Sequence, residues 1–120
     1  MAIEFSYAKF EKEFIHDLRL KISHAEDIAD VINGFSHVAG AFLRKIIDGE
    51  FDLYDDDIIF DSSVEGKYKF SDRLLENKFF LGLIEESDIL NIISKFAETA
   101  DHRYTHLSKH PLKSDLKIRR

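Results

Sequence analysis

Three histidines and a glutamate recur at four-residue steps near the end of the chain: Glu98, His102, His106 and His110. In a helix, residues four apart lie on one face, and two histidines at that spacing can bind one divalent metal ion. All three histidines cannot share one ion, because eight residues of helix span about 12 Å. A metal site would therefore use His102 and His106 with a carboxylate from elsewhere. The simpler interpretation is a solvated polar helix face, and we expect no metal and no cofactor.

Arg103 and His110 are seven residues apart, so they project from the same side of a helix. The pair resembles the element of HEPN-type ribonucleases in which four to six residues separate an arginine from a histidine. That resemblance implies a helical dimer with a cleft where Arg103 holds phosphate and His110 moves a proton. Arg19 and His24 fit the same spacing across an expected helix break, so the pattern is easily met. The other interpretation is a helix end whose basic side chains complement the helix dipole.

His37 is expected on one face of a long helix, together with Asp30, Asn33 and Arg44. An exposed histidine on a small helical domain invites comparison with phosphotransfer domains. Their usual His-x-x-Lys-Gly motif is absent here, so we expect an ordinary surface histidine.

The segment from residue 48 to residue 65, which we call the acidic strip, contains eight acidic residues and no lysine or arginine. Large apolar side chains lie between the carboxylates: Phe51, Tyr54, Ile58 and Phe60. The spacing lacks the alternating oxygen ligands and central glycine of a calcium-binding EF-hand loop. Charge that attracts a partner and rings that anchor it are typical of protein-binding surfaces. The alternative is a solvated loop beside a hairpin.

We predict that the acidic strip docks a basic partner protein. The residues that we expect to make the contact are Phe51, Asp52, Tyr54, Asp55, Asp56, Asp57 and Asp61.

The opposite end of the chain is basic. Residues 103–120 carry six basic residues and one acidic residue, although the net charge of the chain is −6. We expect the molecule to repel nucleic acid, except through this basic end. The first residues lack a basic stretch followed by an apolar one, so we expect no secretory signal, and the longest apolar run, Phe79 to Ile84, is too short for a bilayer. Because the chain also lacks cysteine, we expect a cytoplasmic protein without membrane contact.

The spacing of apolar residues predicts two helices in the first half of the chain. The first carries an apolar stripe at steps of three and four, from Tyr7 to Ile22. Ser23 and Glu26 match a capping box, which would start a second helix over 24–48 that ends before Gly49.

The second half predicts a small hairpin and two further helices. Short β-like runs lie at 58–60 and 67–70. Ser71 would cap a helix over 72–84 with Phe79 in its core stripe. Ser87 and Asp88 would cap a last helix over 88–109, which Pro111 would end.

These elements predict one mainly helical domain over residues 1–111 and a basic tail over 112–120. The domain would be a four-helix antiparallel bundle-like fold, with a two-stranded hairpin between helices two and three. A chain of 120 residues that is 44% hydrophobic supports one such core. No motif names a reaction, so we interpret the chain as a small acidic binding protein of the inhibitor, antitoxin or immunity type. A HEPN-like dimeric, metal-independent ribonuclease is the alternative, and a homodimer stays open.

Overall fold

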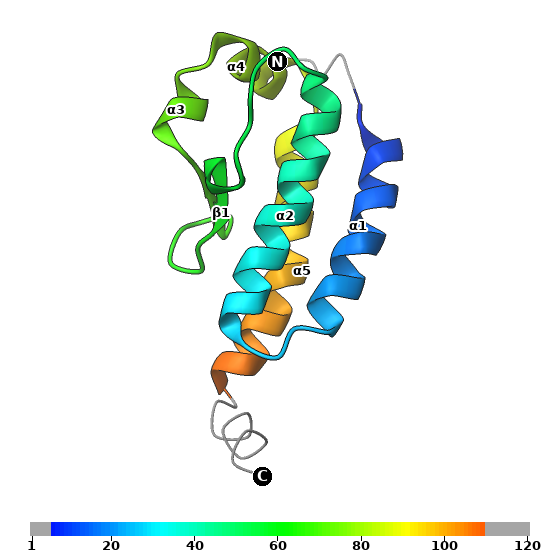
Figure 1. Cartoon of the computed structure of the whole chain (residues 1–120), viewed down its shortest axis with the longest axis vertical. Helices are drawn as coiled ribbons and strands as arrows, with labels where there is room; N and C mark the ends of the chain where they lie inside the picture. The colour runs from blue at the N-terminus through cyan, green and yellow to red at the C-terminus, as the bar shows by residue number, and fades with distance from the viewer. Residues whose placement is uncertain (1–5, 110–120) are drawn as a thin grey trace.

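The computed structural model describes residues 6–109, and three long helices form its main body. Figure 1 shows them side by side, with α2 running opposite to α1 and α5. The shorter elements lie on the side of α2 away from α1. The long helices are α1 (Ala8–Ser23), α2 (Ile28–Ile47) and α5 (Ile89–Lys109); the shorter elements are η1 (Asp55–Asp57), β1 (Ile58–Phe60), β2 (Tyr68–Phe70), α3 (Asp72–Leu75) and α4 (Lys78–Glu86).

Aromatic rings join the three long helices in the core. The Phe42 ring of α2 packs edge-on against Phe96 of α5, at 5.3 Å between centroids, and against Phe14 of α1, at 5.8 Å. Phe42 and Phe96 are fully buried. Edge-to-face contacts add to the burial of apolar area. The sequence placed all three rings on inward stripes, and the structure confirms this.

α2 begins at a different residue from the one that the sequence predicts. Asp27 caps the helix, because its Oδ1 accepts a hydrogen bond from the Asp30 amide at 2.8 Å. The Ser23 hydroxyl instead donates to the Leu20 carbonyl of α1 at 2.9 Å. The predicted capping box at 23–26 is therefore wrong: Ser23 belongs to the last turn of α1, and an aspartate is an equally good cap.

β1 and β2 form the predicted antiparallel hairpin, in which Ile58 pairs with Phe70 and Phe60 with Tyr68. The Ser36 hydroxyl of α2 donates to the Ile58 carbonyl at 2.9 Å, in a buried position. This bond satisfies both polar groups and fixes β1 against α2.

The helix predicted over 72–84 is divided into α3 and α4. Ser71 caps α3 as predicted, and its Oγ accepts from the Leu74 amide at 3.1 Å. Asn77 then starts α4, since its side chain accepts from the Phe80 amide at 3.0 Å. The break turns Phe80 into the core and leaves Phe79 42% exposed. The prediction of Phe79 as a core residue is wrong because it assumed one unbroken helical period.

The junction before α5 also holds the start of α1. The Asp88 carboxylate accepts from the Tyr7 amide at 2.9 Å and from the Ser6 hydroxyl at 2.8 Å. These bonds satisfy an amide at the start of α1. They also tie the first described residues to the start of α5, more than 80 residues later in the sequence.

The predicted mainly helical fold, with a hairpin between the second helix and the next, is confirmed. His110, Pro111 and the predicted tail over 112–120 lie outside the described residues. Within residues 6–109, no helix combines the length and the apolar character that crossing a bilayer requires.

Candidate functional site

Two arginines hold the acidic segment that follows α2. We call residues 51–57 the clamped segment; it leaves the end of α2 and runs back along that helix toward β1 (Figure 1). Arg44 of α2 donates from Nε and Nη2 to the Leu53 carbonyl, at 3.1 and 3.0 Å, and from Nη2 to Asp55 at 2.9 Å. Arg73 of α3 donates to the Asp52 carbonyl at 2.8 Å. The planar guanidinium groups therefore fix the main chain of the segment from two sides.

Asp57 is the internal anchor of the clamped segment. Its side chain is only 3% exposed and forms an ion pair with Arg73. It also accepts from the Tyr54 amide at 2.8 Å and from the Ser71 hydroxyl at 2.6 Å. Burial alone would raise the pKa of Asp57, but the hydrogen bonds from Ser71, Tyr54 and Arg73 outweigh it and lower the pKa. Asp57 is therefore ionised, and its carboxylate is bound by Ser71, Tyr54 and Arg73 within the fold.

Tyr54, Asp52 and Asp56 form the exposed side of the clamped segment. Tyr54 is 55% exposed, and the Arg73 guanidinium lies 4.7 Å from its ring centroid. The side chains of Asp52 and Asp56 are exposed, and neither forms an ion pair with a described residue. Two exposed carboxylates without an ion-pair partner among the described residues, and an aromatic ring that lies against Arg73, therefore belong to a backbone that two arginines hold.

The other predicted contact residues lie in different surroundings. Asp55 is exposed, but its charge is paired with Arg44 at 2.9 Å. Phe51 is half-buried and packs edge-on against Phe79 of α4, at 6.2 Å between centroids. Asp61 lies beyond β1 in the hairpin loop, 3.4 Å from Lys69. Hydrogen bonds from Ser63 lower the pKa of Asp61, with a smaller effect from Lys69.

The structure thus shortens the predicted acidic strip. Ile58 and Phe60, which the sequence placed among its apolar side chains, are core residues with 0% and 4% exposure. Sequence analysis placed Arg44 beside His37 and did not connect Arg44 or Arg73 with the strip, because both lie outside it along the chain. The hairpin could have indicated the contact between Asp57 and Ser71. If Ile58 pairs with Phe70, the residues before and after them, 57 and 71, lie side by side.

Arg103 makes an internal contact instead of facing open solvent. Its Nη2 donates to the Ala25 carbonyl, in the turn between α1 and α2, at 2.7 Å. Its Nε is buried without a hydrogen-bond partner among the described residues. His110, the second residue of the HEPN-like pair, lies outside the described residues. Within residues 6–109, Arg103 therefore joins α5 to the α1–α2 turn.

His102 and His106 lie on α5, and both are exposed. His102 lines a hollow between α1 and α5 together with Glu98 and Arg19. Residues 6–109 contain no group of three histidine, aspartate or glutamate side chains arranged to hold a metal ion. The two histidines therefore lack the further ligand that a site in this part of the chain would need.

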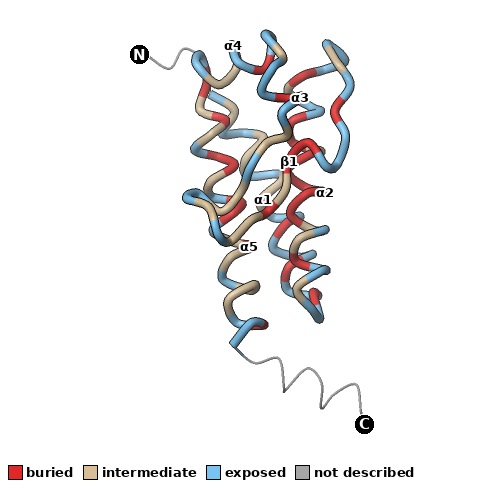
Figure 2. Tube along the Cα trace, turned by 90° about the vertical axis from the view of Figure 1, so that its left-hand side faces the viewer, coloured by how far each residue is buried: buried red, intermediate tan, exposed pale blue. Residues whose placement is uncertain are grey.

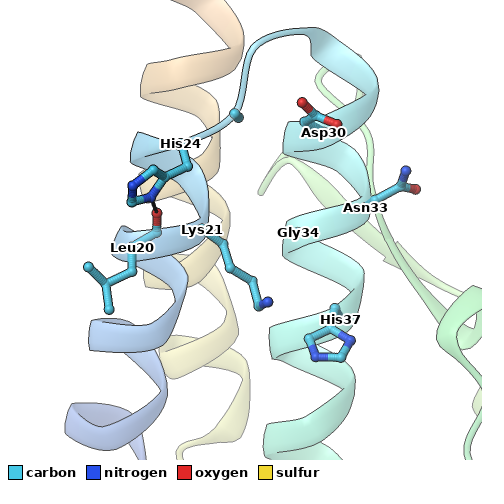
Figure 3. A pocket seen from close by; sticks show the side chains of 8 residues that line it. Leu20, Lys21, His24, Asp30, Asn33, Gly34 and His37 are labelled. Carbon is cyan, nitrogen blue, oxygen red and sulfur yellow. Dashed lines mark hydrogen bonds between the residues drawn. The ribbon is translucent and has the colours of Figure 1, made fainter.

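A shallow groove lies between α1 and α2 (Figure 3). Lys21 of α1 and His24, directly after α1, line it on one side, and Gly34 and His37 of α2 on the other. His24 Nδ1 lies 2.8 Å from the Leu20 carbonyl, so this nitrogen carries the proton and donates it. His37 is exposed, as the sequence predicts, and lies on the open side of α2 in Figure 3. No hydrogen bond joins the two imidazoles in this part of the chain.

Among the described residues, the clamped segment combines exposed carboxylates and an exposed ring with a backbone that two arginines hold. Such a surface can attract cations and pack against apolar side chains of another protein. Comparison with known proteins finds no family model that matches the chain, no similar curated protein and no similar solved structure.

Proposed function

We propose that this chain is a small acidic cytosolic protein that docks a basic partner protein through the exposed side of the clamped segment. The functional class is that of inhibitors, antitoxins and immunity proteins, which cover a basic surface of the protein that they neutralise. The observation that carries the proposal is the arrangement of Asp52, Tyr54 and Asp56. Each of these side chains is exposed, while the main chain between them is held by Arg44 and Arg73.

Fixed geometry favours binding because a surface that is already ordered loses little conformational freedom when a partner docks. Free carboxylates accelerate the encounter with a basic partner, and a central aromatic ring slows its departure. The buried Asp57 and the paired Asp55 help to keep the segment ordered. Asp52 and Asp56 would supply the attracting charge, and Tyr54 the central ring.

The test begins with capture of partners from a lysate of the native cell on the immobilised protein, at low and at high salt. The kinetics of association are then measured with the purified partner. Replacing both Asp52 and Asp56 with asparagine should lower the association rate constant by about tenfold at low salt, and little at high salt, because salt screens exposed charges. Tyr54→Ala should mainly raise the dissociation rate constant, about tenfold for each 1.4 kcal/mol of lost contact.

A matched control removes two exposed charges from another face. Asp17→Asn with Glu98→Gln changes the net charge equally, on α1 and α5. This control should leave association within about twofold of the original rate if the position of the charge matters. A partner that responds equally to both double variants, or the absence of any specific partner at low salt, would contradict the proposal.

A further inference from the structure

α4 is far more apolar than its burial requires. Six apolar or glycine residues follow one another from Phe79 to Ile84, yet Phe80 is the one residue of α4 that is fully buried. Phe79 and Leu81, on either side of it, are 42% and 40% exposed. Figure 2 shows α4 at one end of the molecule, with most of its trace exposed or intermediate. Leu83 and Ile84 pack against the core, so the apolar area that the described fold leaves open on this helix belongs to Phe79 and Leu81.

Gly82 adds an open position on the outer side of the same helix. A Cβ built on Gly82 would meet nothing within 4 Å, so no described residue requires a glycine here. Glycine is unfavourable inside a helix, and its usual return is the close approach of another backbone. Phe79 and Gly82 are three residues apart, so they lie on the same face of the helix. On that face the Phe79 ring projects, and the backbone at Gly82 is not covered by a side chain.

The exposed face of α4 continues into the clamped segment. The Phe79 ring contacts Phe51, at 6.2 Å between centroids, and Phe51 is followed two residues later by Leu53 on the Arg44 clamp. We define the α4 surface as Phe51, Phe79, Leu81 and Gly82. It adjoins the exposed carboxylates of the proposed docking site, which by themselves offer Tyr54 as a single exposed ring.

The charges around the α4 surface select the kind of partner. Glu50 and Asp52 flank Phe51 along the chain, Glu76 lies just before α4, and Glu85 and Glu86 end it; Lys78, the exposed first residue of α4, is the one basic residue of this helix, so acidic side chains outnumber it five to one. None of them forms an ion pair with a described residue. A second copy of the chain would bring like charges face to face, which opposes self-association through this surface. A basic partner would neutralise them.

We infer that the α4 surface is the anchoring half of the docking site and takes an amphipathic basic helix of the partner. The apolar face of that helix packs against Phe79 and Phe51, its backbone approaches Gly82, and its lysines or arginines meet the surrounding carboxylates. This inference rests on the proposed function, because the same partner spans the α4 surface and the clamped segment.

Two synthetic peptides of equal length and charge separate the inference from the proposed function. One peptide has leucines three and four residues apart and lysines between them, so that a helix of this sequence has an apolar face. The other peptide has glutamine in place of each leucine. Binding is measured by fluorescence anisotropy with the full chain at low salt. We expect the lysine–leucine peptide to bind at least tenfold more tightly than the lysine–glutamine peptide. A glutamate–leucine peptide of the same pattern should not bind.

Phe79→Ser provides the decisive variant, and Leu20→Ser its matched control. Leu20 is 50% exposed and Phe79 is 42% exposed. Leu20 lies near the C-terminal end of α1, outside the α4 surface. Phe79→Ser should weaken binding of the lysine–leucine peptide about tenfold and leave the lysine–glutamine peptide unchanged. Leu20→Ser should change neither. Circular dichroism verifies that both variants keep their helix content.

Equal affinity for the two basic peptides, or equal effects of the two serine variants, would overturn the role of α4 while the acidic surface stands. Binding of the glutamate–leucine peptide would overturn the requirement for a basic partner. A dimer in sedimentation that Phe79→Ser abolishes would assign the α4 surface to a second copy and overturn the inference. If neither basic peptide binds at low salt, the proposed function fails as well.

Discussion

Replacing Asp57 with asparagine should destabilise the fold although it changes one atom of the side chain. Asp57 Oδ1 accepts from Ser71, while Oδ2 accepts from the Tyr54 amide and from Arg73. Asparagine keeps one acceptor and presents an NH₂ group to the remaining donors. The loss of a charged acceptor for the Tyr54 amide should cost about 2–3 kcal/mol. We add nothing for Arg73, because its side chain is 48% exposed and regains water.

The same substitution should remove part of the acid sensitivity of the protein. The pKa of Asp57 is lowered below its ordinary 3.8 in the folded state. Above 3.8 the carboxylate is ionised in both states, so its contribution to stability is complete. As the pH falls below about 4, the unfolded chain binds the proton first, and the contribution is lost by the time the pH passes the folded pKa. Asp57→Asn should therefore flatten the fall of stability in this pH range.

Urea denaturation followed by circular dichroism measures both effects, at neutral pH and at several pH values between about 2 and 5. Asp56→Asn is the matched control, because Asp56 is the neighbouring residue, is exposed and pairs with no described residue. It should change the free energy of unfolding by less than about 0.5 kcal/mol. Equal effects of the two substitutions, or an unchanged pH dependence in Asp57→Asn, would refute the reasoning.

Three further substitutions test the fold. Gly40→Ala should stabilise the protein by about 0.5–1 kcal/mol, because helix propensity favours alanine and the new Cβ would lie no closer than 3.6 Å to its neighbours; thermal denaturation measures this. Arg103→Ala should destabilise it by about 1–2 kcal/mol through loss of the bond to the Ala25 carbonyl, whereas an unchanged stability in urea would argue that Arg103 has no structural role. Phe96→Ala should cost about 3–5 kcal/mol in urea, and a loss below about 1 kcal/mol would place that ring outside the core.

Helical periodicity predicted the parts of the fold that repeat. The stripes containing Phe14, Phe42 and Phe96 follow a regular spacing, and these rings meet where the helices face one another. Periodicity failed where a helix is interrupted, as between α3 and α4. Asn77 resembles any polar residue on a helix surface until its side chain is seen to accept the Phe80 amide.

The clamped segment could be predicted only in part. Its charge and its exposed tyrosine are properties of the residues themselves, so the sequence identified them. The three consecutive aspartates at 55–57 look alike in the sequence, yet one is paired with Arg44, one is free and one is buried. What separates them is the path of the chain, which brings Ser71 and Arg73 to Asp57 after the hairpin has turned back. No repeating pattern of residues in the sequence indicates this path, so the contacts of Asp57 could not be predicted from periodicity.

The clamps act mainly on carbonyl groups. Arg44 and Arg73 bind the main-chain oxygens of residues 53 and 52, which every amino acid possesses. None of these carbonyl bonds requires a particular side chain at positions 52, 54 and 56, although the Tyr54 ring also lies against Arg73. We therefore expect these positions to tolerate changes of charge or size while the backbone keeps its course, provided that the two arginines and Asp57 remain. If the segment docks a partner as proposed, its exposed side chains can vary with the partner while the bonds that hold its backbone stay the same.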